Sequence, residues 1–160
     1  MQGYNYPREY IAAQGPKPNT GHDFWRMVLQ DSVESIVMLT SLVENNKDKC
    51  HEYFPKLNGL IRFANLSVTC KSEEVHPTFI KRVLEAEKVC RDVKSPSEHR
   101  LTFKYNMQAG VKHAVKHYYF TCWPDHGVPS DTAGLIEFCK TVRSERKRLN
   151  KTIIVHCRFA

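Results

Sequence analysis

Two short segments carry residues that could do chemistry. The run Ile153–Cys157 reads Ile-Ile-Val-His-Cys, and its β-branched residues predict a strand that delivers His156 and Cys157 to a loop. A second segment, Trp123–Pro129, reads Trp-Pro-Asp-His-Gly-Val-Pro and offers a carboxylic acid at Asp125. A cysteine can act as a nucleophile and a nearby carboxylic acid as a proton donor. The two segments together predict covalent catalysis by a cysteine.

Each of these residues also has a simpler structural explanation. A lone cysteine after an apolar strand is most often a buried, unreactive thiol. The pair Pro-Asp is ordinary turn chemistry. Because Trp123 and His126 surround Asp125 in a pattern that a turn does not require, we favour the catalytic interpretation.

Length and composition limit the class of protein. The chain has 160 residues, which corresponds to one domain or part of one, and its hydrophobic content of 41% is that of a globular protein. No run approaches the roughly 20 apolar residues of a membrane span, and the start lacks an apolar signal region. Six scattered cysteines without a C-x-x-C pair argue against a zinc site and favour free thiols. We therefore expect a cytosolic chain or a piece of a longer protein, with no metal.

The net charge of +7 is compatible with an anionic partner. Much of the excess lies in the segment Arg143–Lys151, for which a solvated helix face is the favoured interpretation. No aromatic residue interleaves with this segment, as stacking on single-stranded nucleic acid would require. We therefore expect no nucleic-acid partner.

Hydrophobic periodicity predicts the strands that would position the two segments. Buried or alternating runs indicate strands at Tyr10–Ala13, Ser35–Thr40, Leu60–Phe63, Leu66–Thr69, Val115–Cys122 and Ile153–His156. The segment Thr78–Val89 permits either a helix or a strand. Polar residues predict a turn at Asn45–Asp48 and a loop at Lys94–Ser97.

Two helices complete the pattern. The first begins at Thr20, which we predict to be the N-cap with Asp23 as its capping-box partner. The second runs over Asp131–Leu149 after a cap at Ser130 or Asp131, with an apolar stripe of Leu135, Phe138, Cys139, Val142 and Leu149. Helices alternating with strands predict an α/β (α+β) domain with a mixed sheet.

Six ordered motifs resemble those of the protein tyrosine phosphatases, along nearly the whole chain. They are Tyr10–Pro16, Asp23–Val28, Ile36–Thr40, Lys49–Pro55, the aromatic strand leading into Trp123–Pro129, and Ile153–Cys157. Phe54 stands where the family usually has Trp, and Gly3–Tyr10 is similar to receptor-type members. The resemblance implies a highly twisted mixed sheet flanked by helices.

The resemblance also implies a mechanism and a site. Cys157 would attack the phosphorus of phosphotyrosine, and Asp125 would protonate the leaving oxygen and later act as base, without metal or cofactor. The supporting residues that it implies are His156 in the nucleophile loop, Trp123 and His126 in the acid loop, Glu44 opposite the signature arginine, and Lys49 against the acid loop. The implied partners are phosphotyrosine-containing proteins, in the cytoplasm or on the cytoplasmic portion of a membrane receptor.

The family signature continues after His-Cys with Ser-Ala-Gly-x-Gly-Arg, whereas Arg158 and Phe159 follow Cys157 here. We therefore expect residues 1–160 to be part of a phosphatase catalytic domain, incomplete at both ends and inactive by itself. The alternative is a catalytically dead, phosphatase-like module that binds or regulates other proteins.

Overall fold

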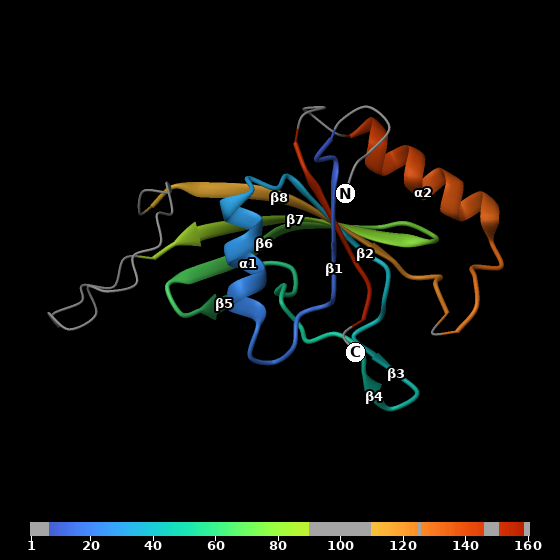
Figure 1. The fold of residues 1–160 in the computed structure, drawn as a ribbon, viewed down its shortest axis with the longest axis horizontal. Coiled ribbons are helices and arrows are strands. Elements are labelled where there is room, and N and C mark those ends of the chain that lie inside the picture. Colours follow the sequence, from blue (N-terminus) through green and yellow to red (C-terminus); the bar gives the residue numbers. More distant parts are fainter. Residues whose placement is uncertain (1–6, 90–109, 125, 146–150, 159–160) are drawn as a thin grey trace, which may run out of the picture.

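The computed structural model describes residues 7–89, 110–124, 126–145 and 151–158 (Figure 1). One seven-stranded sheet has the strand order β1-β9-β2-β8-β7-β6-β5, and β3 pairs with β4 in a separate hairpin. The elements in chain order are β1 (Tyr10–Ala13), α1 (Gly21–Gln30), β2 (Ser35–Met38), β3 (Val43–Glu44), β4 (Lys47–Asp48), β5 (Leu60–Phe63), β6 (Leu66–Val75), β7 (Phe79–Lys88), β8 (Lys112–Phe120), α2 (Thr132–Ser144) and β9 (Ile153–His156). The predicted mixed α+β architecture is confirmed. The predicted loop Lys94–Ser97 lies outside the described residues.

The first four strands in the sheet order are parallel. Strand β9 lies between β1 and β2, with Ile154 opposite both Ile11 and Ile36, and β2 also pairs with β8. All four residues of β2 are buried, as expected for a parallel strand covered on both faces. The predicted strand ends at Met38, two residues earlier than expected. The prediction of an interior strand for the segment before Cys157 is confirmed.

The other half of the sheet is antiparallel. Strand β7 pairs with β6 on one side and β8 on the other, and β5 forms the outer edge next to β6. The ambiguous segment Thr78–Val89 is therefore a strand. Its buried residues include Phe79, Leu84 and Ala86, and two long neighbours supply its backbone hydrogen bonds. Tertiary pairing thus decides a segment whose local pattern allowed both structures.

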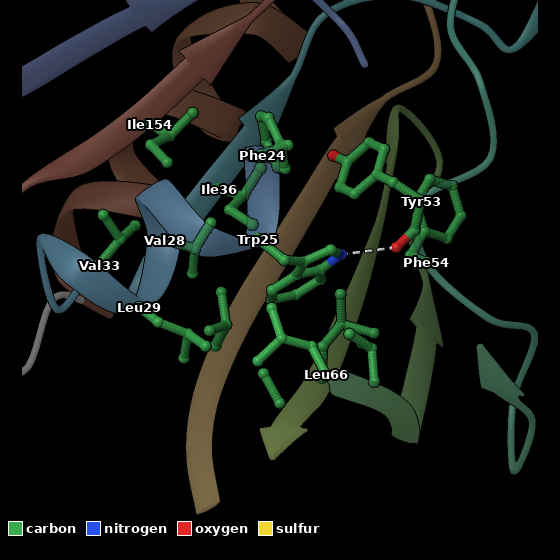
Figure 2. Packing of buried hydrophobic residues seen from close by; sticks show 14 of the residues in the cluster. Phe24, Trp25, Val28, Leu29, Val33, Ile36, Tyr53, Phe54, Leu66 and Ile154 are labelled. Atoms are coloured by element: carbon green, nitrogen blue, oxygen red, sulfur yellow. Dashed lines mark hydrogen bonds between the residues drawn. The ribbon is translucent and has the colours of Figure 1, made fainter. Parts of the chain in front are cut away.

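The two helices cover opposite faces of the sheet. Helix α1 buries Trp25 and Val28 against Ile36 and Ile154 (Figure 2), whereas α2 buries Phe138 in a second cluster. The second cluster also contains Val37, Tyr118, Phe120 and Ile153. Because successive side chains of a strand point to opposite faces, neighbours such as Ile153 and Ile154 enter different clusters.

The starts of the helices differ from the prediction in one case. Helix α1 does begin after Thr20, but the Thr20 side chain makes no cap bond and instead accepts a hydrogen bond from the Lys17 amide, at 2.8 Å. The proposed partner Asp23 forms an ion pair with Arg26. The capping box was therefore wrong, because a local turn takes the hydroxyl. At α2, Asp131 is the cap, and its carboxylate accepts from the Gly134 amide.

The predicted polar turn is the tip of the β3–β4 hairpin. Asn45 and Asn46 have φ angles of 51° and 58°, the left-handed pair that a two-residue hairpin favours. Lys47 and Asp48 belong to β4, so the turn is shorter than predicted.

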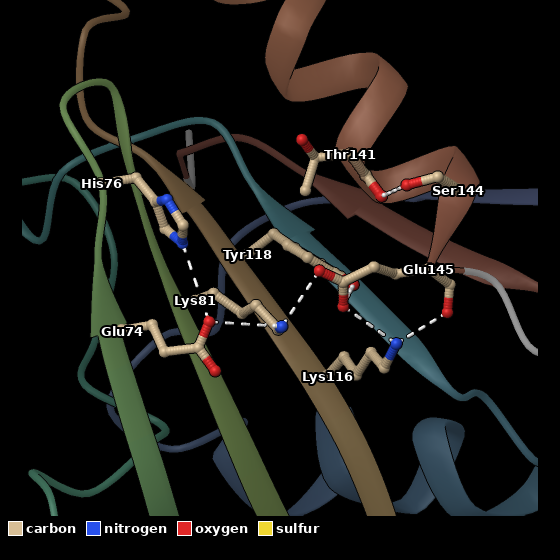
Figure 3. Close-up of polar contacts among 8 residues, drawn as sticks. All are labelled: Glu74, His76, Lys81, Lys116, Tyr118, Thr141, Ser144 and Glu145. Atoms are coloured by element: carbon tan, nitrogen blue, oxygen red, sulfur yellow. Dashed lines mark hydrogen bonds and ion pairs between the residues drawn. The ribbon is translucent and has the colours of Figure 1, made fainter.

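A polar network fixes the C-terminal end of α2 to the sheet (Figure 3). Glu145 accepts hydrogen bonds from Lys81 and Lys116, each at 3.0 Å, and from the Tyr118 hydroxyl at 3.2 Å. Burial alone would raise the pKa of Glu145, but the hydrogen bonds from Lys81 and Lys116 outweigh burial and lower it. The carboxylate therefore stays charged between two cations. Helix α2 ends at Ser144, and the predicted extension to Leu149 lies outside the described residues.

Candidate active site

The nucleophile segment and the acid segment leave the sheet at the same edge. Strands β9, β2 and β8 are parallel, so their carboxyl ends share one edge. Cys157 follows β9 there, and Trp123 and Pro124 follow β8. Only β2 separates these strands, which places their ends roughly 10 Å apart. Asp125 lies outside the described residues, so its position remains a prediction, although the residues on both sides of it are described.

Three loops meet at Cys157. A Cβ atom at Gly15 would lie 2.7 Å from the Cys157 carbonyl oxygen and 2.9 Å from the Cys50 sulfur. Only glycine fits this crossing, because any side chain would collide with both loops. The His51 amide donates to the Pro16 carbonyl at 2.8 Å and ties the same segments together. The loop after β1 thus packs directly beneath the proposed nucleophile.

The two cysteines at this crossing have different environments. Cys157 is exposed, whereas Cys50 is buried. Burial, with a smaller contribution from neighbouring Cys157, raises the pKa of the Cys50 thiol to about 12. Cys50 is therefore a protonated, unreactive thiol at neutral pH, and Cys157 is the accessible one of the pair.

His156 is held in a fixed orientation next to Cys157. Its ring is buried, with Nδ1 at 2.9 Å from the Cys157 carbonyl oxygen and Nε2 at 2.7 Å from the Tyr53 hydroxyl. Burial lowers the pKa of His156 to about 4, against a smaller opposite effect of the bond to the Cys157 carbonyl. The ring is neutral at pH 7, so it donates one hydrogen bond and accepts the other.

Sequence reasoning missed two buried residues that join this group. The Tyr53 hydroxyl also lies 2.8 Å from Nε2 of His117, and both side chains are fully buried. Burial, then Arg82 and His156, lower the pKa of His117 well below its ordinary value of 6.5. The signal was present, since strand alternation puts His117 on the inward face with Val115, where a polar side chain needs a partner.

We predict that stability falls steeply on mild acidification. Unfolded histidines bind a proton near pH 6.5, but folded His156 does so only near pH 4 and His117 well below 6.5. Between these values the unfolded state binds more protons, so stability present above pH 6.5 is lost as the pH falls. The free energy of unfolding should drop by about 1.4 kcal/mol per pH unit for each histidine. Urea unfolding between pH 7 and 5 measures this slope.

The matched control is His117→Gln, which removes one of the two groups. Its slope over the same range should be about half that of the native chain, whatever its absolute stability. A flat profile between pH 6.5 and 5 in the native chain would contradict two neutral buried histidines.

Glu44 and Lys49 lie in and beside the β3–β4 hairpin. Glu44 is half-buried and faces Lys47 across the hairpin, whereas Lys49 is buried and its amide donates to the Leu42 carbonyl at 2.7 Å. Lys49 is adjacent to Cys50, which packs against the Gly15 crossing. The structure thus brings Lys49 to the neighbourhood of Cys157, and its role remains a prediction.

Trp123 begins the acid segment and lies near α2. Its ring meets Phe120 edge-on, with centroids 6.4 Å apart, and it is 36% exposed. It lines an apolar cavity of about 310 Å³ together with Leu135 and Phe138 of α2 and Ile153 of β9. Cys139 also lines this cavity, on the predicted apolar stripe with Leu135, Phe138 and Val142, although it is exposed. His126 is exposed in the segment after Pro124.

Among the described residues, no group of three or more His, Cys, Asp or Glu side chains is placed to hold a metal ion. In the same part of the chain, no helix combines the length and apolarity that a membrane crossing needs.

The fold agrees with comparisons with known proteins. A family model described as protein-tyrosine phosphatase matches residues 1–159. The chain is 38% identical over 159 residues to mouse receptor-type tyrosine-protein phosphatase eta, covering 98% of the chain and 11% of that relative. It is 35% identical over 149 residues to mouse tyrosine-protein phosphatase non-receptor type 4, covering 93% of the chain and 14% of that relative. It is also 35% identical over 158 residues to human phosphatidylinositol phosphatase PTPRQ, covering 98% of the chain and 6% of that relative.

The chain belongs to the protein-tyrosine phosphatase family, a family of hydrolases. It spans 11%, 14% and 6% of the lengths of these three relatives. The resemblance inferred from the sequence motifs is confirmed at the level of the family.

Proposed function

We propose that residues 1–160 form part of a catalytic domain that hydrolyses phosphotyrosine in proteins, in the cytoplasm or on the cytoplasmic side of a receptor. The observation that carries this proposal is the shared sheet edge, where the strand before Cys157 and the strand before Asp125 both end. Nucleophile and acid must flank one phosphate group, which this arrangement allows.

The chemistry proceeds in two steps. The Cys157 thiolate forms a bond to phosphorus while the bond from phosphorus to the tyrosine oxygen breaks, and Asp125 donates a proton to that oxygen. Water then attacks the phosphorus, Asp125 accepts a proton from the water, and the Cys157 thiolate leaves as phosphate is released. The phosphate dianion requires backbone amides at a helix N-terminus and an arginine, which the family signature supplies after the cysteine.

The role of Asp125 can be tested in a chimera. Residues 1–157 replace the matching part of the catalytic domain of the mouse eta relative, which then supplies the signature loop and the flanking segments. We expect Asp125→Asn to lower kcat on a phosphotyrosyl peptide about 100- to 10,000-fold, since general acid catalysis contributes about that much. The loss should be smaller on p-nitrophenyl phosphate, whose nitro group stabilises the departing phenolate.

Steady-state kinetics on both substrates measures this difference, with Asp131→Asn as the control because that carboxylate caps α2. An equal loss of kcat on the two substrates would contradict the role of Asp125 as the general acid. Phosphoseryl peptides and a phosphoinositide are assayed in parallel, and preference for either would contradict a phosphotyrosine substrate.

A further inference from the structure

A row of buried polar groups connects strand β7 to the backbone of Cys157. Arg82 and His117 are paired across β7 and β8, the His117 ring lies 2.8 Å from the Tyr53 hydroxyl, and that hydroxyl lies 2.7 Å from His156. His156 reaches the Cys157 carbonyl at 2.9 Å. The two bonds of the Tyr53 hydroxyl are buried, so the proton positions on Tyr53 and on the two histidines constrain one another.

The Cys157 end fixes one direction for this row. A carbonyl oxygen only accepts, so Nδ1 of His156 must carry the proton. Because the buried ring is neutral, its Nε2 is then an acceptor, and the Tyr53 hydroxyl donates to it. Tyr53 has used its only proton, so it must accept from Nε2–H of His117. Nδ1 of His117 is then left as a bare acceptor.

The opposite end of the row is compatible with the same direction. Two buried polar side-chain atoms have no hydrogen-bond partner among the described residues: Nη1 of Arg82 and Nδ1 of His117. Arg82 is paired with His117 on the neighbouring strand, and its guanidinium is a cation that only donates hydrogen bonds. After burial, the charge of Arg82 is the next cause that lowers the pKa of His117, so it disfavours the doubly protonated, cationic ring. Arg82 is itself held in place by Glu73, at 2.6 Å, and by stacking 4.7 Å above the Phe54 ring.

We propose that His117 is a positioning residue for the nucleophile, which under the control of Arg82 sets the direction of the hydrogen-bond row that ends on the Cys157 carbonyl. Without a donor at position 117, the Tyr53 hydroxyl could equally accept a hydrogen bond from Nε2–H of His156. Nδ1 of His156 would then carry a lone pair instead of a proton, and it would face the Cys157 carbonyl oxygen without a hydrogen bond. His117 thus prevents a tautomer that would release the loop bearing the thiol. Phe54 supports the arrangement because its ring packs against the His117 ring, with centroids 4.5 Å apart, and against the Arg82 guanidinium.

The first test needs no variant. In the 160-residue chain labelled with ¹⁵N, the ring nitrogens of histidine report their protonation, since an unprotonated nitrogen resonates far downfield of a protonated one. At pH 7 we expect the unprotonated nitrogens to be Nδ1 of His117 and Nε2 of His156. The opposite tautomer at either residue would overturn the proposal.

The second test separates hydrogen bonding from packing. His117→Gln keeps a side-chain N–H that can donate to Tyr53, whereas His117→Leu fills space without a donor. We expect solvent exchange of the His156 Nδ1 proton to become about threefold to tenfold faster in His117→Leu, the effect of one ordinary hydrogen bond. It should stay within about twofold of the native rate in His117→Gln. Equal exchange rates in the two variants would show that position 117 acts only through packing.

Tyr53→Phe provides the internal control, because it breaks the row between the two histidines. Exchange in this variant should be as fast as in His117→Leu, and the double variant should be no faster than either; additive effects would overturn the proposal. The meaning of this row for catalysis rests on the proposed role of Cys157. The NMR measurements need no enzyme turnover. They can therefore contradict the tautomers of His117 and His156 without bearing on whether Cys157 is the nucleophile.

Discussion

A polypeptide of these 160 residues is expected to hydrolyse p-nitrophenyl phosphate no faster than its own Cys157→Ser variant. Only Arg158, Phe159 and Ala160 follow the nucleophile in that polypeptide. It therefore contains neither the amide-lined loop nor the signature arginine that would hold the phosphate. Removing a single preorganised donor costs about 100- to 1,000-fold in turnover, and several are missing together. Arg158 directly follows Cys157, and in this polypeptide no helix orients it toward the phosphate.

The chimera with the eta relative is the positive counterpart of this experiment. If residues 1–157 are competent, the chimera should hydrolyse the substrate and its Cys157→Ser variant should not. An inactive, folded chimera would favour the alternative of a phosphatase-like binding module. Turnover by the 160-residue polypeptide well above its serine variant would show that the signature loop is less important than we argue.

Much of the fold could be predicted because its strands follow local rules. Ser35–Met38 and Ile153–His156 are continuous apolar runs, and in the structure both lie inside the parallel half of the sheet. The segment Thr78–Val89 was ambiguous, because its structure depends on pairing with β6, to which a short turn joins it, and with β8, which begins only at Lys112. The Thr20 cap failed for a related reason, since a competing turn to Lys17 cannot be recognised from the capping pattern alone.

The candidate site was predictable in part. Cys157 and the acid segment stand out by residue type, and parallel strand order then brings their ends to one edge. Tyr53 and His117 did not stand out, because Tyr53 contacts His156 across 103 residues of sequence and His117 across 64 residues. Gly15 was likewise visible only as part of a motif, whereas the structure shows that it makes room for the Cys157 carbonyl. Strand alternation can place His117 on the inward face, but it does not identify the distant polar group that His117 contacts there.

The largest single loss of stability is expected for Trp25→Ala. Trp25 is fully buried at the centre of the α1 cluster (Figure 2), and its indole N–H donates to the Tyr53 carbonyl at 2.8 Å. Truncating a buried tryptophan costs about 3–5 kcal/mol through lost transfer energy and the cavity left behind. That is a large share of the roughly 5–15 kcal/mol by which domains are stable. The variant should be largely unfolded at 37 °C by circular dichroism.

The chain contains a second tryptophan that serves as the matched control. Trp123→Ala should change the free energy of unfolding by less than about 1 kcal/mol, because that ring is partly exposed on the acid segment. It also leaves Trp25 as the sole tryptophan, so its fluorescence should report a buried indole in the folded state. The loss of stability in Trp25→Phe should lie between those of the two alanine variants. Phenylalanine keeps an aromatic ring in the core but removes the N–H that donates to the Tyr53 carbonyl. Similar losses of stability for Trp25→Ala and Trp123→Ala would contradict the packing of α1 on the sheet. They would also contradict the fixed position of Tyr53, whose hydroxyl bonds to His156 next to the proposed nucleophile.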